Sequence, residues 1–110
     1  MAQTIRKYWG PLQPGRNSLN YNWAAINQDS VVLVSASEFS IQNPPSDEYR
    51  FLGDASVTVE NIVPHGPPYD LNHGVTFIVN VTWGSAINVV TDITVLASAP
   101  VEVDFYTPPK

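Results

Sequence analysis

The stretch 74–97, GVTFIVNVTWGSAINVVTDITVLA, carries the clearest secondary-structure pattern in the chain. Apolar and polar residues alternate on both sides of Gly84 and Ser85, and a β-strand sends successive side chains to opposite faces. The stretch therefore predicts two half-buried antiparallel strands joined by a tight turn. The positions expected to face the core are Val75, Phe77, Val79, Val81 and Trp83, and then Ile87, Val89, Thr91, Ile93, Val95 and Ala97.

The two strands are expected to pair as a hairpin, and the length of the turn decides which faces meet. A two-residue loop would place Trp83 opposite Ala86, so an apolar face would lie beside a polar one. A three-residue loop at 84–86 places Trp83 opposite Ile87 instead, and the remaining apolar positions then coincide. The pattern favours this odd-length loop, or a bulge with the same effect.

Alternation of the same kind predicts strands elsewhere and no amphipathic helix. Turn-forming prolines and glycines are concentrated in 8–17, 42–47, 64–72 and the bend at 98–100. The other predicted strands are 1–7 (an arm or edge strand), 19–23, 31–41, 49–51, 55–63 and 101–105. Short strands rich in Val, Ile and Thr at intervals of roughly 8–12 residues predict an all-β fold. We expect a single-domain antiparallel β-sandwich of six to seven strands over residues 1–110.

Composition narrows the classes of function. The chain has a net charge of −5 with only five Lys and Arg, and these form no basic stripe, which argues against nucleic acid and anionic membranes as partners. No apolar run approaches the length of a membrane span, so no membrane insertion is expected. The absence of cysteine excludes disulfides and thiolate chemistry. The N-terminus, MAQTIRKYWG, lacks the apolar core of a signal peptide, which leaves localisation open between the cytoplasm and non-classical release.

Few residues could support catalysis. His65 and His73 flank Asp70 in the loop that precedes residue 74, but this spacing matches no established set of metal ligands. Neither a GxSxG nucleophile turn nor a glycine-rich phosphate loop is present. We therefore expect a non-catalytic protein without a metal or other cofactor.

Aromatic and neutral polar residues are more informative. Only 14 % of residues are charged, and a surface of Asn, Ser, Thr and Gln is typical of oligomers and of proteins that bind neutral polar ligands. An aromatic ring can stack on the apolar face of a sugar. The aromatic residues expected at strand ends or in loops are Trp9, Tyr21, Trp23, Tyr69, Trp83 and Tyr106. We expect Trp23 in the core or an interface, whereas Trp83 stays open between a buried and a sugar-stacking role.

Several of these stretches resemble the H-type lectins, the family of the snail agglutinins and the discoidin lectin domain. The order of strand, Trp, short turn and alternating strand in 74–97 resembles the C-terminal half of that family. Upstream, VVLVSASEF and ASVTVENIV resemble two of its core strands, and Pro14-Gly15-Arg16-Asn17 resembles its PGR-type turn. The resemblance covers roughly residues 15–97. It implies a six-stranded antiparallel sandwich that forms a trimer and binds galactose or N-acetylgalactosamine in a cleft between protomers.

By position, the resemblance places Gly15 and Asn17 in a turn that hydrogen-bonds the sugar, and Trp83 as the ring that stacks on it. The chain departs from the family at Gly84, where a polar residue, commonly His, often follows the Trp. It also has Asp54 near the position of the family's sugar-clamping Arg.

Arg50 is a candidate substitute for that missing Arg. The loop 64–73 is longer than the tight turn of the family, and it adds Tyr69, Asp70 and His73 as candidate carbohydrate-binding residues. The chain then either binds a different ligand or keeps only the scaffold.

Two functions lead from these observations. The first is a lectin-like, non-catalytic protein that binds a glycan as a homo-oligomer, suspected to be a trimer, with a role in cell adhesion. The second is a structural or adhesive assembly protein, such as a virion, tail or surface component, which the low charge and the Pro-rich C-terminal residues favour. A protein-interaction domain of Ig-like shape is a third interpretation.

Overall fold

The computed structural model describes residues 2–41, 48–96 and 101–106, and over these residues it confirms the predicted all-β fold. The expected loop at 42–47 and the bend at 98–100 lie outside the described residues. No helix in the described part is long and apolar enough to cross a membrane. The seven strands are β1 (Ala2–Leu12), β2 (Gly15–Asn22), β3 (Val31–Ile41), β4 (Glu48–Phe51), β5 (Ser56–His65), β6 (Gly74–Thr82) and β7 (Ile87–Leu96).

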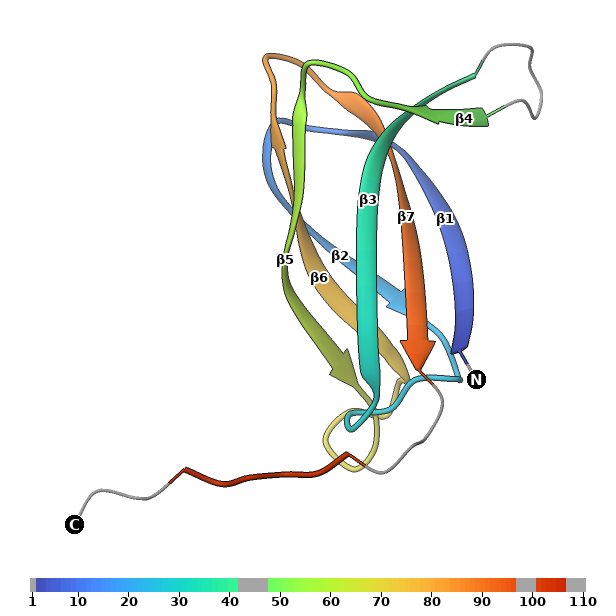
Figure 1. Cartoon of the computed structure of the whole chain (residues 1–110), viewed down its shortest axis with the longest axis vertical. Helices are drawn as coiled ribbons and strands as arrows, with labels where there is room; N and C mark the ends of the chain where they lie inside the picture. Colours follow the sequence, from blue (N-terminus) through green and yellow to red (C-terminus); the bar gives the residue numbers. More distant parts are fainter. Residues whose placement is uncertain (1, 42–47, 97–100, 107–110) are drawn as a thin grey trace.

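The strands form two antiparallel sheets that face each other (Figure 1). The four-stranded sheet has the order β1-β7-β3-β4, and the three-stranded sheet has the order β2-β6-β5. The connections β1–β2, β2–β3, β4–β5 and β6–β7 each carry the chain from one sheet to the other. This is the predicted β-sandwich, with β6 at the centre of one sheet and β7 next to β1 and β3 in the other.

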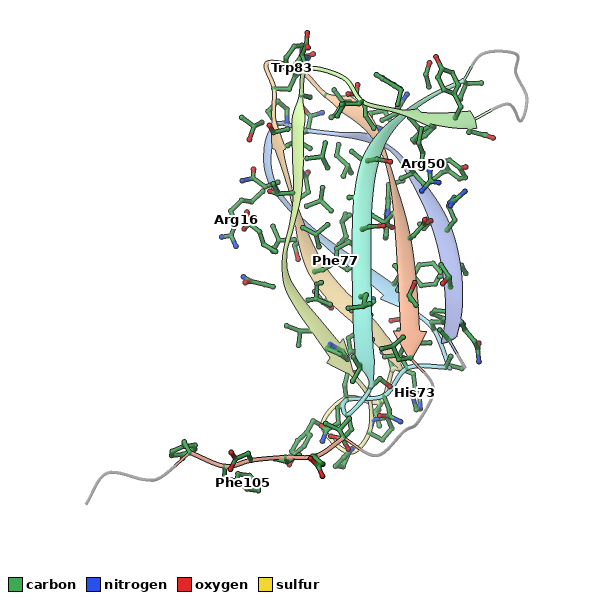
Figure 2. The ribbon with its side chains drawn as sticks, in the orientation of Figure 1. Arg16, Arg50, His73, Phe77, Trp83 and Phe105 are labelled. Carbon is green, nitrogen blue, oxygen red and sulfur yellow. The ribbon has the colours of Figure 1, made fainter. Side chains whose placement is uncertain are left out.

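The core lies between the inner faces of β6 and β7, as the alternation in 74–97 predicts. Phe77 is fully buried near the middle of the sandwich (Figure 2). Ile26, from the loop between β2 and β3, closes the core at one end. The predicted core residues that are buried are Val75, Phe77, Val79, Val81, Ile87, Val89, Thr91, Ile93 and Val95. Trp83 is half exposed, and Ala97 lies outside the described residues.

The hairpin predicted for this stretch is wrong. β6 pairs with β2 and β5, while β7 pairs with β1 and β3, so residues 83–86 cross between the sheets. The two apolar faces meet across the interior and not side by side in one sheet. Either arrangement removes the same side chains from water, so alternation alone cannot distinguish them.

The N-terminal strand is longer than predicted. The turns expected throughout 8–17 are confined to residues 13 and 14, because β1 continues past Trp9 and Pro11. A register shift between Tyr8 and Gly10 leaves Trp9 in a bulge, and Gly10 has a φ of 79° that favours glycine. Pro11 is tolerated since β1 is an edge strand and its proline needs no second partner.

The bulge directs Trp9 into the sandwich. Its indole Nε1–H donates a hydrogen bond of 2.8 Å to Oγ1 of Thr91, a fully buried polar side chain. Its ring also meets Phe77 edge-on, with 6.2 Å between the ring centroids. A buried hydroxyl without a partner would destabilise the core, so Trp9 has a structural role and is not a surface ring.

The last predicted strand, 101–105, is also absent as a paired strand. Residues 101–106 are exposed and pair with no strand among the described residues. In Figure 1 they run as an extended segment away from both sheets.

Candidate functional site

The six candidate carbohydrate-binding residues do not come together. His73 directly precedes β6 and Trp83 directly follows it, so the nine residues of this strand separate them by roughly 30 Å. Figure 2 shows Trp83 and His73 at opposite ends of the sandwich. We call these the Trp83 end and the His73 end. The first holds Gly15, Asn17 and Trp83, and the second holds Tyr69, Asp70 and His73.

Strand register places two turns beside Trp83. Gly15 is opposite Val81 on one side of β6, which puts the turn before β2 next to the end of this strand. Ser56 is opposite Thr82 on the other side, which puts the turn before β5 there as well. Both turns and the 83–86 connection therefore form the Trp83 end.

Trp83 presents its indole at this end with 47 % of the residue exposed. Nothing lies within 4 Å of the Cβ position that a side chain at Gly84 would occupy, so the space beside the Trp is open. Asp54, exposed in the turn before β5, adds a carboxylate at the same end. An accessible ring with a nearby carboxylate can stack on an apolar surface and accept hydrogen bonds from hydroxyl groups.

Asn17 shapes its own turn. Its side-chain Nδ2 donates to the backbone carbonyls of Gln13 at 2.9 Å, Gly15 at 3.1 Å and Val79 at 3.3 Å. These bonds fasten the β1–β2 turn to β6, and Gly15 supports the turn with a φ of 96°. The amide nitrogen predicted to bind a sugar is thus directed at backbone carbonyls.

Arg50 does not take the place of a sugar-clamping Arg at the Trp83 end. Its Nη1 donates to Oδ2 of Asp92 at 3.1 Å, on the outer face of the four-stranded sheet. Arg6 binds the same carboxylate through two bonds of 2.6 and 2.9 Å. Arg50 is thereby held on β4, apart from Trp83 (Figure 2).

The pKa of Asp92 is lowered from its usual value of 3.8, because Arg6 donates hydrogen bonds to the carboxylate. Burial opposes this change, and the positive charges of Arg6 and Arg50 add to it. Asp92 correspondingly raises the pKa of Arg6. Since the folded pKa of Asp92 is lowered, the ion cluster stabilises the fold above the unfolded pKa, and this contribution is lost as the pH falls through the folded value.

We expect Asp92→Asn to lower the free energy of unfolding at pH 7 by about 1 kcal/mol, because the amide loses the charge but can still accept a hydrogen bond. The variant should also lose less stability than the wild type between pH 5 and pH 2. Urea unfolding at several pH values measures both effects. Asp29→Asn is the control, since Asp29 is exposed and has no ion-pair partner in the described part of the chain. An equal acid dependence of the two variants would contradict this role for Asp92.

The basic residue close to the Trp83 end is Arg16. Its Nε lies 3.3 Å from Oε1 of Glu60, across the outer face of the three-stranded sheet. Asn80 Nδ2 donates to the other oxygen of Glu60 at 3.4 Å. Arg16 follows Gly15 in the PGRN turn, so the turn itself was the signal that could have identified it. Glu60 has no such signal, because only the pairing of β5 with β6 brings it near.

His73 has a structural role at the opposite end. Its Nδ1–H donates to the carbonyl oxygen of the buried Ile26 at 2.6 Å. The backbone N–H of Trp23 donates to the carbonyl oxygen of His73 at 2.8 Å. These bonds join the loop between β2 and β3 to the loop between β5 and β6, so His73 is used to close the sandwich.

The loop around Asp70 is organised in the same manner. Asp70 Oδ1 accepts the backbone N–H of Asn72 at 2.9 Å, and Oδ2 lies 3.6 Å from Nδ1 of His65. His65 also contacts the Asn72 carbonyl oxygen at 2.6 Å and Oδ1 of Asn20 at 2.7 Å. Tyr69, at 85 % exposure, is the candidate here that stands in solvent. The described residues contain no group of three His, Asp or Glu side chains placed to hold a metal ion.

The Trp83 end therefore combines a half-exposed ring, two turns and the Arg16–Glu60 pair on the adjoining face. No protein-family model, curated protein or solved structure matches this chain. The function of the chain is accordingly inferred from the arrangement of these residues.

Proposed function

We propose that the chain is a non-catalytic, lectin-like protein that binds a glycan at its Trp83 end. The half-exposed indole of Trp83 carries this proposal, because the ring is accessible at the end of β6 and open space lies beside it at Gly84. A galactose-type sugar offers an apolar face for the ring and hydroxyl groups for Asp54 and the turn backbones. The six strands of 8–11 residues also accord with the six-stranded sandwich of the H-type lectins that the sequence resembles.

One chain alone supplies few directed polar groups at this end. Asn17 bonds its own turn, and Arg16 is paired with Glu60. A neighbouring copy would add further donors and acceptors around Trp83. We therefore place the glycan in a cleft between subunits of a homo-oligomer, with galactose or N-acetylgalactosamine as the first sugars to test.

We expect Trp83→Ala to weaken glycan binding by tenfold or more, equivalent to about 1.4 kcal/mol, because the stacking ring is removed. A glycan array identifies the ligand, and calorimetry with that ligand measures the loss. The matched control is Tyr69→Ala, which removes an exposed aromatic ring at the His73 end and should leave the affinity unchanged. Far-UV circular dichroism checks that both variants keep the β-fold.

If the wild-type chain binds none of the galactose, fucose, mannose and sialic acid glycans on the array, the proposal is overturned. Unchanged binding by Trp83→Ala would also do so. A loss confined to Tyr69→Ala would move the site to the His73 end.

A structural or adhesive assembly protein without sugar binding is the second candidate. The observation that favours it is an exposed aliphatic patch on the outer face of the four-stranded sheet. Strand register brings Val31 opposite Leu96, and Leu33 lies two residues further along β3; all three side chains are exposed. A wild-type chain that ignores every glycan but forms a large assembly by light scattering would favour this function over the first.

A further inference from the structure

Residues 101–106 have the pattern of a β-strand without a sheet. Val101, Val103 and Phe105 alternate with Glu102 and Asp104, which would give one apolar and one acidic face. Phe105 is 81 % exposed, and no described residue pairs with this segment. In Figure 1 it extends in red away from the sandwich. These three apolar side chains are exposed to water. Burying them against a suitable sheet edge would contribute favourable free energy to the association.

The edge of β1 fits such a strand. β1 pairs with β7 on one side, and on its other side the described residues place no strand. Ile5 and Trp9 lie on its inner face and pack against the core while remaining only partly buried. An added strand with its apolar side chains turned inward would cover Ile5 and extend the core. It would also pair the free backbone groups of β1.

Charge favours an acidic strand at this edge. Arg6 and Lys7 lie next to each other on β1, and the ammonium of Lys7 is 5.5 Å from the centre of the Trp9 ring. Lysine on an edge strand normally prevents pairing with other strands, because its charge would be trapped. Glu102 reverses this effect where it lies opposite Arg6, since it brings negative charge to that cation. The same residues that repel a second β1 would therefore select this segment.

The other edges are poorer acceptors. β5 has no Lys or Arg and contains the acidic Glu60, and β4 has four residues. β2 offers one cation, Arg16, which is paired with Glu60, whereas β1 offers Lys7 in addition to Arg6, which binds Asp92. Among the described edges, β1 thus combines length, positive charge and incompletely covered apolar residues.

Topology favours a second copy over the chain's own β1. Leu96 is opposite Ala2, so β7 ends where β1 begins, and only residues 97–100 separate it from Val101. A segment that continued from there along its own β1 would run parallel to it. Every strand pair among the described residues is antiparallel. A segment from another copy can approach β1 in the antiparallel direction.

We propose that residues 101–106 add as an antiparallel strand to the free edge of β1 in a second copy of this chain. In the register that brings charges together, Glu102 lies opposite Arg6, Val103 opposite Ile5, and Val101 opposite Lys7. Each copy can donate its own segment and accept another, so the contact can close into a ring or continue as a filament. Strand addition of this kind does not depend on glycan binding.

Sedimentation equilibrium of the full chain tests the association. The wild type should form species heavier than the 12.1 kDa monomer, and Val103→Pro should weaken self-association by tenfold or more, because proline cannot donate to a ladder. Val103→Thr keeps the shape and the strand propensity and is the matched control. Val103 is exposed, so circular dichroism and thermal unfolding of both variants should match the wild type. A monomeric wild type, or an unchanged association of Val103→Pro, would overturn the proposal.

Cysteine cross-linking tests the identity of the edge, and the native chain contains no cysteine that could interfere. A mixture of Lys7→Cys chains and Val101→Cys chains should give a mixed disulfide, recognised by its mass, which can form only between two copies. The control mixture pairs Val101→Cys with Ser18→Cys, an exposed position on β2, and should give at least tenfold less product. Equal yields from the two mixtures, or no mixed disulfide at Lys7, would overturn β1 as the acceptor. The second result would be expected if the segment folded onto the aliphatic patch of its own chain.

Charge reversal tests the alignment of the two strands. Glu102→Lys should weaken self-association by tenfold or more, because it places a second cation opposite Arg6. Glu102→Gln removes the charge but keeps the shape of the side chain, and it should weaken self-association less. An unchanged association of folded Glu102→Lys would contradict the proposed alignment of the two strands.

Discussion

Phe77→Ala should lower the free energy of unfolding by about 3–5 kcal/mol, which is a large share of the stability of a chain of this size. Phe77 is fully buried on β6, the central strand of its sheet, and is among the largest side chains without exposed surface. Its ring also contacts Trp9 edge-on. Alanine would leave a cavity that strands on both sides cannot fill without breaking their pairing. Urea unfolding followed by circular dichroism measures the change.

Phe105→Ala is the matched control for this substitution. It removes the same atoms from a side chain that is 81 % exposed, so the change in unfolding free energy should stay within about 0.5 kcal/mol. The contrast separates burial from the chemistry of the phenyl ring. The comparison is made under dilute, monomeric conditions, because the proposed strand addition would let Phe105 contribute to stability at high protein concentration. A comparable loss in both variants under dilute conditions would show that segment 101–106 contributes to the stability of the monomer.

Gly74→Ala should destabilise the fold by about 3 kcal/mol, at the upper end of the usual range for overpacking, because the obstacle is backbone. Gly74 is the first residue of β6 and is buried opposite Asn22 and His65 in the flanking strands. An added Cβ would overlap the carbonyl oxygen of Tyr21. It would also lie 2.8 Å from the Asn22 Cα and 2.9 Å from Cε1 of His65. The strands must separate to admit it, at the end where the loops are joined.

Gly84→Ala is the control, since nothing lies within 4 Å of the corresponding Cβ position. Neither glycine has a positive φ, so the difference between the two variants reports steric overlap and not backbone conformation. We expect Gly84→Ala to stay within about 0.5 kcal/mol of the wild type in the same unfolding experiment. Similar stability of the two variants would show that β2 and β5 move apart readily at Gly74.

The positions of the strands could be predicted from the local sequence pattern, because burial of one face of a strand makes apolar and polar residues alternate. This held for β3, β5, β6 and β7, whose bounds lie within one or two residues of the predicted ranges. It failed for 101–105, where alternation is present but no partner strand is among the described residues. It also failed near Trp9, because a bulge lets an edge strand continue through residues that usually make turns.

The local sequence pattern predicted only part of the candidate site. The sequence left Trp83 open between a buried and an exposed role, and the structure leaves it half exposed. Its place beside the Gly15 turn follows from the pairing of β2 with β6. The use of His73 to hold Ile26 could not be read from the chain, since 47 residues separate the two. For the same reason nothing in the loop sequence showed that Asp70 would bond its own backbone or that Arg50 would reach Asp92.

The stretch 74–97 shows where the boundary lies between sequence and tertiary structure. By itself the sequence determined that this stretch holds two strands, each with one apolar face that must leave water. Only the tertiary structure decided that β6 and β7 belong to different sheets and face each other across the core. The reason is physical: burial depends on which face a side chain is on, whereas sheet membership depends on backbone pairing with β1, β2, β3 and β5, which the alternation of side chains does not encode.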